Sequence, residues 1–394
     1  MDRDALWLWF TSIFGLSSNK TNRLLEKYGS VDELFKIPEM VLMDSPDFTL
    51  SQKKEIILFN IEAYKRKKEL LSSKGIHVIS IENPCYPKNL REINNPPFVL
   101  YVMGNLTSLS HSYPITMVGT RNPDAYGKKA AFGISAALSA KGACIVSGLA
   151  GGCDSLCHEG ALSSSGTTIG VCACGIDVDY PKNSLETRKD ICEKGCIISE
   201  FPPHYPVRPA NFAIRNRILS GMSLATVIIQ GKLKSGTMIT ANYAVNQNRD
   251  LYVLTGDPFN PLSEGPLSLL KDGASPFISC DDIMEHYKSI YKDPLFVPKK
   301  EEKKETLKNT PTSSRRRKTA APKKEKEEPK VKKIPDSLPE EQKDVLKILQ
   351  EGPLQIDELC SKLNLPSHRL LSILTELELF SYVKALPGGI YKAL

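Results

Sequence analysis

Between residues 115 and 280, short and almost uninterrupted apolar runs alternate with longer stretches of helical character. Parallel strands that are covered by helices on both faces need apolar side chains at successive positions, whereas half-exposed strands alternate polar and apolar ones. The pattern therefore predicts a doubly wound α/β domain with a Rossmann-like, mostly parallel sheet. The expected strands are Ile115–Val118, Cys144–Gly148, Thr168–Ala173, Cys196–Ser199, Ala225–Ile229 and Leu251–Leu254, with helices over Gly127–Ala140 and Thr237–Asn248.

Residues 1–75 are predicted to form a separate helical unit, similar to a sterile-alpha-motif (SAM) or helix-hairpin-helix module. Gly29 is placed to end one of its helices, and Ser30 followed by Glu33 is a capping-box pattern that starts the next. The stretch 14–29 resembles a helix-hairpin-helix, which binds nucleic-acid backbones without sequence preference. The simpler interpretation of this unit is a helical packing module.

The α/β domain is expected to span residues 76–290, opening with a short strand and a proline-rich connection over 76–110. Residues 291–335 are mostly Lys, Glu, Pro, Ser and Thr, a composition that predicts a disordered linker. Residues 336–394 recover helical periodicity and end in a hairpin pattern, the outline of a winged helix. Its apolar stripes are Val345, Ile348, Leu349; Ile356, Leu359, Leu363; and Leu370, Leu371, Leu374, Leu377.

Charge is concentrated in one segment. The chain has a net charge of +7, but residues 298–333 alone carry fifteen Lys and Arg against six Glu, which leaves −2 for the remainder. Any nucleic-acid site in the folded part must therefore be a local patch. The chain has no apolar run long enough to span a membrane, and its first ten residues do not resemble a secretory signal. The ten cysteines show no metal-site spacing, so we expect reduced thiols, a cytoplasmic protein, no metal and no cofactor.

The loops after the predicted strands carry the residues of a possible phosphate site, because ligands of open α/β sheets bind beyond the carboxyl ends of the strands. Most of these loops combine glycine, which exposes backbone N–H groups, with a basic or hydroxyl side chain. The candidates are Gly119, Thr120, Arg121, Gly148, Lys182, Lys234, Ser235, Gly236 and Thr237.

A further candidate is Arg215-Asn216-Arg217, whose arginines are able to hold consecutive phosphates while Phe212 stacks on a base. The alternative is an ion-pair network around Glu200 that braces the sheet. Both interpretations hold if one arginine points inward and the other outward.

Two nucleotide-binding motifs and one catalytic pair are not supported. No lysine follows Gly236, as a Walker A loop requires, and Arg121 stands where a dinucleotide fingerprint needs its second glycine. Asp154 and His158 lie one helical turn apart, a spacing that is more often structural than catalytic. The sequence therefore predicts no catalytic residue.

Taken together, these loops resemble the DprA/Smf family of natural transformation. The resemblance covers residues 80–285 and rests on several motifs in one order: Val118–Arg121, Ser147–Ala150, Asp154 with His158–Leu162, Gly175–Asp177 with Tyr180-Pro181, Ser199-Glu200, Arg215–Ile218 with Ser220-Gly221, and Ser235–Thr237 with Ile239–Ala241. It implies a non-enzymatic protein that binds and protects single-stranded DNA, loads the RecA recombinase and forms a homodimer through the Rossmann-like domain. It also implies that the phosphates are held by Gly119, Thr120, Arg121, Lys182, Arg215, Asn216, Arg217 and Lys234.

Three positions depart from the family pattern. Gly151 replaces a usual arginine, Gln230 a usual glutamate and Leu267 a usual asparagine. The first removes a possible phosphate contact. The long basic linker is able to add salt-sensitive affinity.

Two other functions are possible. One is a phosphoribohydrolase-like enzyme on the same fold, whose motif places a glutamate after the strand–helix turn; here Met238, Ile239 and Thr240 follow the turn instead. The other is a duplex-binding regulator that uses residues 336–394. Its candidate recognition helix has only His368 and Arg369 as basic groups, so a packing or protein-interaction role fits this segment better.

Overall fold

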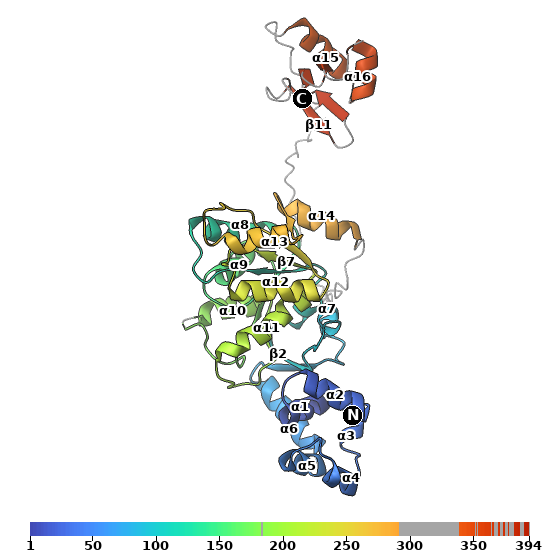
Figure 1. Ribbon diagram of the computed structural model, residues 1–394, viewed down its shortest axis with the longest axis vertical. Coiled ribbons are helices and arrows are strands. Elements are labelled where there is room, and N and C mark those ends of the chain that lie inside the picture. Colours follow the sequence, from blue (N-terminus) through green and yellow to red (C-terminus); the bar gives the residue numbers. More distant parts are fainter. Residues whose placement is uncertain are drawn as a thin grey trace, which may run out of the picture. The chain divides into compact units, whose positions relative to one another are not determined.

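The protein, as a computed structural model, comprises two compact units, Met1–Lys303 and Lys304–Leu394 (Figure 1). Its described residues are 1–182, 184–290, 339–350, 352, 354–363, 365, 369–370, 373–374, 377, 382–386 and 390–393. The linker predicted over 291–335 lies outside the described residues. The three predicted boundaries between the four segments stay predictions.

A mostly parallel sheet forms the middle of the first unit. All six predicted strands are present, as β3 (Pro114–Val118), β4 (Cys144–Ser147), β5 (Thr168–Val171), β6 (Cys196–Ser199), β7 (Ala225–Ile228) and β8 (Asp250–Val253). The expected short strand is β1 (His77–Ser80), while β2 (Val99–Gly104) and β9 (Ser275–Pro276) were not predicted. The spatial order is β1-β2-β6-β5-β4-β3-β7-β8-β9. Among these strands β2 alone runs in the opposite direction, pairing antiparallel with β1 and β6, and the other pairs are parallel, so the predicted fold class is confirmed.

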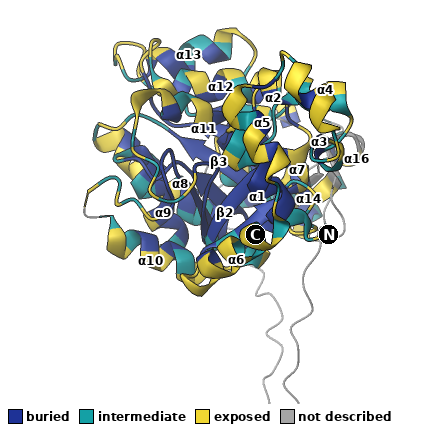
Figure 2. Cartoon of the chain, turned by 90° about the horizontal axis from the view of Figure 1, so that it is seen from below, coloured by how far each residue is buried: buried dark blue, intermediate teal, exposed yellow. Residues whose placement is uncertain are grey.

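Helices cover both faces of this sheet. Along β4, the side chain of Ile145 belongs to the hydrophobic cluster on one face of the sheet, whereas Cys144 and Val146 belong to the cluster on the opposite face. The strands are therefore buried on both sides, as the continuous apolar runs require (Figure 2). One face carries α8 (Ala125–Ala140), α9 (Cys153–Ser163), α10 (Leu185–Lys194) and α14 (Cys280–Ile290); the other carries α7 (Lys88–Arg91), α11 (Pro209–Met222), α12 (Gly236–Asn246) and α13 (Glu264–Lys271).

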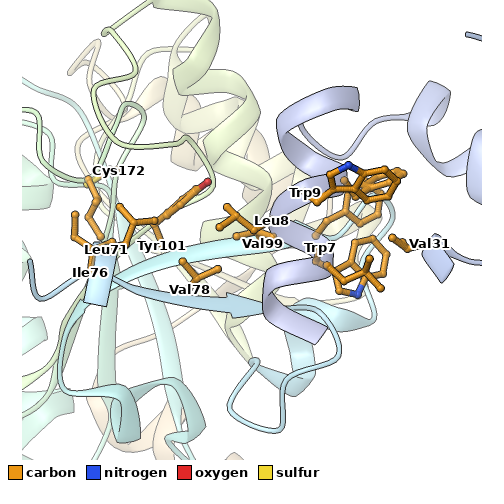
Figure 3. Packing of buried hydrophobic residues seen from close by; sticks show 14 of the residues in the cluster. Trp7, Leu8, Trp9, Val31, Leu71, Ile76, Val78, Val99, Tyr101 and Cys172 are labelled. Atoms are coloured by element: carbon orange, nitrogen blue, oxygen red, sulfur yellow. The ribbon is translucent and has the colours of Figure 1, made fainter. Parts of the chain in front are cut away.

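The N-terminal helices share a hydrophobic core with the sheet. Helix α1 buries its apolar residues Ala5–Phe10, and Trp7 stacks on Phe98 with ring centroids 5.1 Å apart. The same cluster continues through Val99 to Tyr101 on β2 (Figure 3). This packing fixes the helical segment to the β1–β2 edge of the sheet. The segment comprises α1 (Arg3–Phe14), α2 (Asn19–Tyr28), α3 (Val31–Leu34), α4 (Glu39–Asp44), α5 (Leu50–Ile57) and α6 (Ile61–Ser73).

Both predicted helix signals in this segment lie at helix ends, but the capping bond expected at the second is absent. Gly29 ends α2 with φ of 89°, and its N–H donates to Leu25 O at 2.7 Å. Ser30 does precede α3, but its side chain makes no capping bond; its carbonyl accepts from Glu33 N instead, as in a simple turn.

The second unit contains the elements expected of a winged helix. Helices α15 (Glu340–Gln350) and α16 (Ile356–Leu363) accompany a sheet of β10 (Leu354–Gln355), β12 (Ile390–Ala393) and β11 (Val383–Leu386). Strands β11 and β12 form the predicted hairpin, and Val345, Leu359 and Leu374 from the three predicted stripes are buried together. None of the helices in the described part of the chain combines the length and apolar character needed to cross a membrane.

Candidate nucleic-acid interface

A crevice opens at the carboxyl ends of β3 and β7, where the strand order of the sheet reverses. The chain leaves β3 for β4 on one side and, after β6, crosses back to β7 on the other. The loops that follow β3 and β7 therefore diverge, and ligands of such sheets bind between them. The cavity of about 340 Å³ found there is lined by Val118, Gly119, Thr120, Arg121, Ala150, Asp154, Phe212, Arg215, Asn216, Leu219, Ser235, Gly236, Thr237 and Thr240.

The loop after β7 brings the N-terminus of α12 to this crevice. Ser235 is its N-cap residue, yet its side chain makes no capping bond, and its buried Oγ has no hydrogen-bond partner in the described part of the chain. The first N–H groups of a helix lack intrahelical acceptors and carry a partial positive charge. An oxyanion in the crevice would therefore accept hydrogen bonds from both the Ser235 hydroxyl and these amides.

Arg121 supplies an accessible positive charge at the rim. Its side chain is exposed and makes no ion pair with any described residue, and its guanidinium carbon lies 4.7 Å from the centre of the Phe212 ring. An aromatic face holds a cation in place without neutralising it, so the donors of Arg121 stay available for phosphate oxygens. The same contact covers one face of Phe212, the predicted base-stacking residue, so a base must use the other face or displace Arg121.

A second hollow of about 490 Å³ adjoins the crevice and shares Arg121, Phe212 and Asn216 with it. Tyr180 lines this hollow, and its ring meets the Phe212 ring at 5.5 Å in an edge-on arrangement. Tyr180 entered the sequence analysis only as a motif residue. No local pattern marks it, because it reaches Phe212 from a loop more than thirty residues away in the chain.

Arg215 forms the positively charged floor of the crevice and is buried. Its Nη1 donates to the carbonyl oxygens of Gly148 and Val171, the latter at 2.7 Å, and its Nε donates to Asn216 Oδ1 at 3.1 Å. The guanidinium thus ties the loop after β4 to the end of β5. Its charge contributes to the potential of the crevice, but most of its donors are already used.

Asp154 lies beside Arg215 in the crevice floor and was not predicted to be a site residue. Burial raises the pKa of its carboxyl to about 6, and Arg215 together with the backbone amides of Ala150, Gly119 and Gly148 opposes that rise. The carboxylate therefore holds the loops after β3 and β4 by their N–H groups. The amides of Gly119 and Gly148 were predicted to donate to a phosphate, but in the structure they donate to the Asp154 carboxylate.

The glycines of these loops are needed for packing. A Cβ on Gly119 would lie 2.5 Å from Cys153 Sγ, and one on Gly148 would lie 2.3 Å from Arg215 Nη1. Gly119 lines the crevice, whereas Gly148 lies behind Arg215 and does not. Neither position has room for a side chain.

Arg217 does not line the crevice. Its Nη2 donates to both carboxylate oxygens of Glu200 at 2.7 Å, in an ion pair that is almost completely buried. The possibility that one arginine of Arg215-Asn216-Arg217 points outward is therefore not realised, because both guanidinium groups are buried. Lys182 and Lys234 are exposed without ion pairs to described residues and lie outside the cavity lining. Lys234 immediately precedes Ser235 at the rim.

Asp154 and His158 have separate partners, as the structural interpretation of their spacing expects. His158 Nδ1 lies 2.7 Å from Thr168 Oγ1, and burial lowers the pKa of the imidazole to about 3. His158 is outside the crevice lining, so it cannot exchange a proton with a group bound there.

Gln230, one of the departures, joins the loop after β7 to the start of α8. Its Nε2 donates to Asp124 Oδ2 at 2.9 Å, and Asn260 Nδ2 donates to the same oxygen at 2.7 Å. Asp124 in turn caps α8 through Gly127 N. A glutamate at position 230 would place a second carboxylate there in place of a donor, which explains the amide. Leu267 is half-buried on α13, and nothing in the structure explains its choice over asparagine.

Comparison with known proteins agrees with this arrangement. The family model of DNA recombination-mediator protein A matches residues 77–288, and the model of the DprA winged helix domain matches residues 328–389. The DNA processing protein DprA of Bacillus subtilis (strain 168) is 40% identical over 212 residues, which cover 54% of this chain and 71% of that protein. Protein Smf of Escherichia coli (strain K12) is 30% identical over 71% of this chain and 74% of its own length.

A solved structure supports the same conclusion. The X-ray structure of DNA processing protein A from Streptococcus pneumoniae superposes with a TM-score of 0.62 at 27% identity, covering 71% of this chain and 97% of that one. The winged helix predicted for residues 336–394 is confirmed by its family model. The family model for the sheet domain covers more than half of the chain. The chain therefore belongs to the DprA/Smf family, the family of DNA recombination-mediator protein A.

Proposed function

We propose that this protein binds single-stranded DNA through the crevice without reading its base sequence. The observation that carries the proposal is the uncapped N-terminus of α12, with its unpartnered Ser235 hydroxyl, beside Arg121. These groups suit phosphate oxygens, which every sequence presents alike. The names of the relatives, DNA processing proteins, agree with a nucleic-acid ligand.

The crevice and its adjoining hollow favour an unpaired strand over a duplex. Aromatic rings of Phe212 and Tyr180 lie next to the cationic rim, within 5.5 Å of each other. An unpaired base can turn its face to such rings, whereas bases in a duplex are stacked on their neighbours. The cavity volumes of about 340 and 490 Å³ are also those of small-ligand pockets and not of a duplex groove.

Family membership supports a wider role. We propose that the bound strand is protected from nucleases and passed to the RecA recombinase during DNA uptake. We also propose that the protein acts in the cytoplasm as a homodimer formed through the sheet domain. No covalent chemistry is part of the proposal: Asp154, the acid in the crevice, already accepts three backbone amides and serves to position the loops.

The direct test is a salt titration of the full chain with labelled single-stranded and duplex oligonucleotides of mixed sequence. Contacts from Arg121, Lys182 and Lys234 predict that log K falls with log salt with a slope of roughly −2 or steeper, at about −0.7 per phosphate contact. The single strand should bind more tightly than the duplex at every salt concentration. A protein that ignores unpaired oligonucleotides even in dilute buffer would refute the proposed function.

Gly151 offers a way to strengthen the site. A Cβ there would meet nothing within 4 Å, and the backbone is not in the left-handed region, so a side chain fits without strain. Gly151→Arg adds a cation next to Ala150, which lines the crevice. Single-strand affinity should rise about three- to tenfold and the salt slope should steepen by about 0.7.

Gly151→Gln is the matched control for this gain, because it adds a side chain of similar length without charge. Its affinity should stay at the wild-type value in the same salt titration. An equal gain from both variants would show that charge at this position does not act on the strand.

A further inference from the structure

A separate cavity of about 860 Å³ lies where the N-terminal helices meet α11 and α12. None of the residues that line it lines the crevice. The lining comes from the turn that precedes α2 and the first residues of α2, from the turn after α7, and from the middle of α11 and the C-terminal end of α12. Its members are Leu16, Ser17, Ser18, Asn19, Lys20, Asn94, Asn95, Ile214, Arg217, Tyr243, Asn246 and Gln247.

The N-terminus of α2 gives one wall of this cavity a positive potential. Ser18 caps the ten-residue helix by accepting from Thr21 N, which leaves the amides of Asn19 and Lys20 without an acceptor among the described residues. Lys20 is exposed and makes no ion pair with a described residue. An anion at this wall would therefore meet free N–H groups, the helix dipole and an ammonium group together.

Two buried polar atoms on the cavity wall lack partners. Arg217 retains only 6% of its accessible surface, and its Nη2 is bonded to Glu200, but its Nη1 has no partner in the described residues. The same is true of Ser17 Oγ, in a residue that is 8% exposed. Native proteins rarely leave such donors unpaired, so both point to an acceptor that the cavity receives from outside. The Glu200 carboxylate offsets the charge of Arg217, so Lys20 supplies the positive charge of the site and the helix dipole adds to its positive potential.

The rest of the lining is rich in neutral hydrogen-bonding groups. The side chains of Asn19, Asn94 and Asn246 have no hydrogen bond to a described residue, whereas Gln247 is held by Ser220 and by the Arg217 carbonyl. Tyr243 adds a half-buried aromatic ring. Amides match the edges of nucleobases and aromatic rings stack on their faces.

We propose that this cavity binds one nucleotide of the same single strand that the crevice holds. The phosphate lies at the N-terminus of α2 beside Lys20, and the base lies among the amides near Tyr243. Helix α12 has eleven residues and connects the two sites, a distance of about 16 Å. A stacked strand covers that distance with about five nucleotides at about 3.4 Å each. The inference rests on the proposed function and extends the binding track toward the N-terminal helices.

The test measures how tightly the full chain binds oligo-dT of ~4 and of ~20 nucleotides. The shorter oligonucleotide cannot reach both sites at once. Lys20→Glu should weaken binding of the long oligonucleotide on the order of tenfold, the equivalent of one charged hydrogen bond, and leave the short one within about twofold. Asn246→Asp, at a second exposed position of the wall, should act in the same direction. Lys54→Glu is the matched control, because Lys54 is also exposed on the N-terminal helices but does not line the cavity.

Each outcome either supports the cavity as a part of the strand-binding site or rules it out. A loss confined to the long oligonucleotide, in both wall variants and not in the control, supports the proposal. If the wild type binds both lengths but Lys20→Glu behaves like Lys54→Glu, the cavity inference fails while the proposed function stands. If the wild type binds no oligonucleotide, the proposed function itself fails. Calorimetry with thymidine monophosphate tests the alternative ligand. If the wild type binds this nucleotide and Lys20→Glu does not, while oligonucleotide binding is the same in both, the cavity is a site for a free nucleotide and the strand proposal is overturned.

Discussion

Arg121→Ala should weaken binding to single-stranded oligonucleotides of every sequence by about 10- to 100-fold, the value of one or two charged hydrogen bonds. The guanidinium is exposed, makes no ion pair with a described residue and rests on Phe212 at the rim of the crevice. Its removal takes away a cation that no other side chain of the cavity lining replaces, because Arg215 is committed to backbone carbonyls. Fluorescence anisotropy with homopolymers and mixed sequences measures the effect, and the salt slope should become shallower by about 0.7.

Two variants separate charge from geometry in this experiment. Arg121→Lys keeps the charge but loses the planar fork and should fall between wild type and alanine. Arg66→Ala removes an exposed arginine from α6, far from the crevice in the chain, and should change little. Lys234→Ala should cost less than Arg121→Ala, because Lys234 lies outside the cavity lining. Wild-type affinity in both Arg121→Ala and Lys234→Ala would show that the strand binds elsewhere.

Arg217→Met should lower the free energy of unfolding of the first unit by about 3–5 kcal/mol, because it leaves Glu200 buried without its counter-charge. The two side chains are only 8% and 2% exposed, and Nη2 bonds both carboxylate oxygens. For a unit of this size the melting temperature should fall by about 10 °C. Calorimetry or chemical denaturation at neutral pH measures the change.

The loss of stability in Arg217→Met should grow as the pH rises from acid to neutral. Burial raises the pKa of Glu200, and Arg217 opposes that rise; without Arg217 the pKa should rise further. The folded variant then holds the Glu200 proton more tightly than the unfolded chain does, so its stability falls as pH rises through the range between the two pKa values. The difference from wild type should therefore shrink in acid and be largest at neutral pH.

The double variant Arg217→Met/Glu200→Met is the control for this argument. Replacing both members of a buried ion pair with apolar side chains of similar size is often neutral, so the double variant should be more stable than Arg217→Met alone. If the single variant unfolds at the wild-type midpoint, the pair does not brace the sheet as its burial indicates.

The sequence was sufficient for the six strands in the middle of the sheet, whereas the site at their carboxyl ends stays a prediction. Parallel strands that are buried on both faces leave continuous apolar runs, and all six runs became strands. Strands β3 and β7 are neighbours where the strand order reverses, so the loops after them diverge and flank the crevice. Strand β2 was missed because it lies directly after a proline-rich connection, where its run Val99–Gly104 was read as part of the connection.

The roles of individual polar residues were decided only by the tertiary structure. Arg215 and Arg217 are two positions apart in the sequence. Arg215 donates to carbonyls of the loop after β4 and of the end of β5, whereas Arg217 pairs with Glu200, because residues two apart on a helix point to different parts of the fold. Asp154 gained its role from three amides that come from two loops. Local pattern determines backbone conformation and which face is apolar, since both depend on neighbours in the chain. The partner of a buried charge depends on atoms brought together from distant segments, and only the packed fold specifies those.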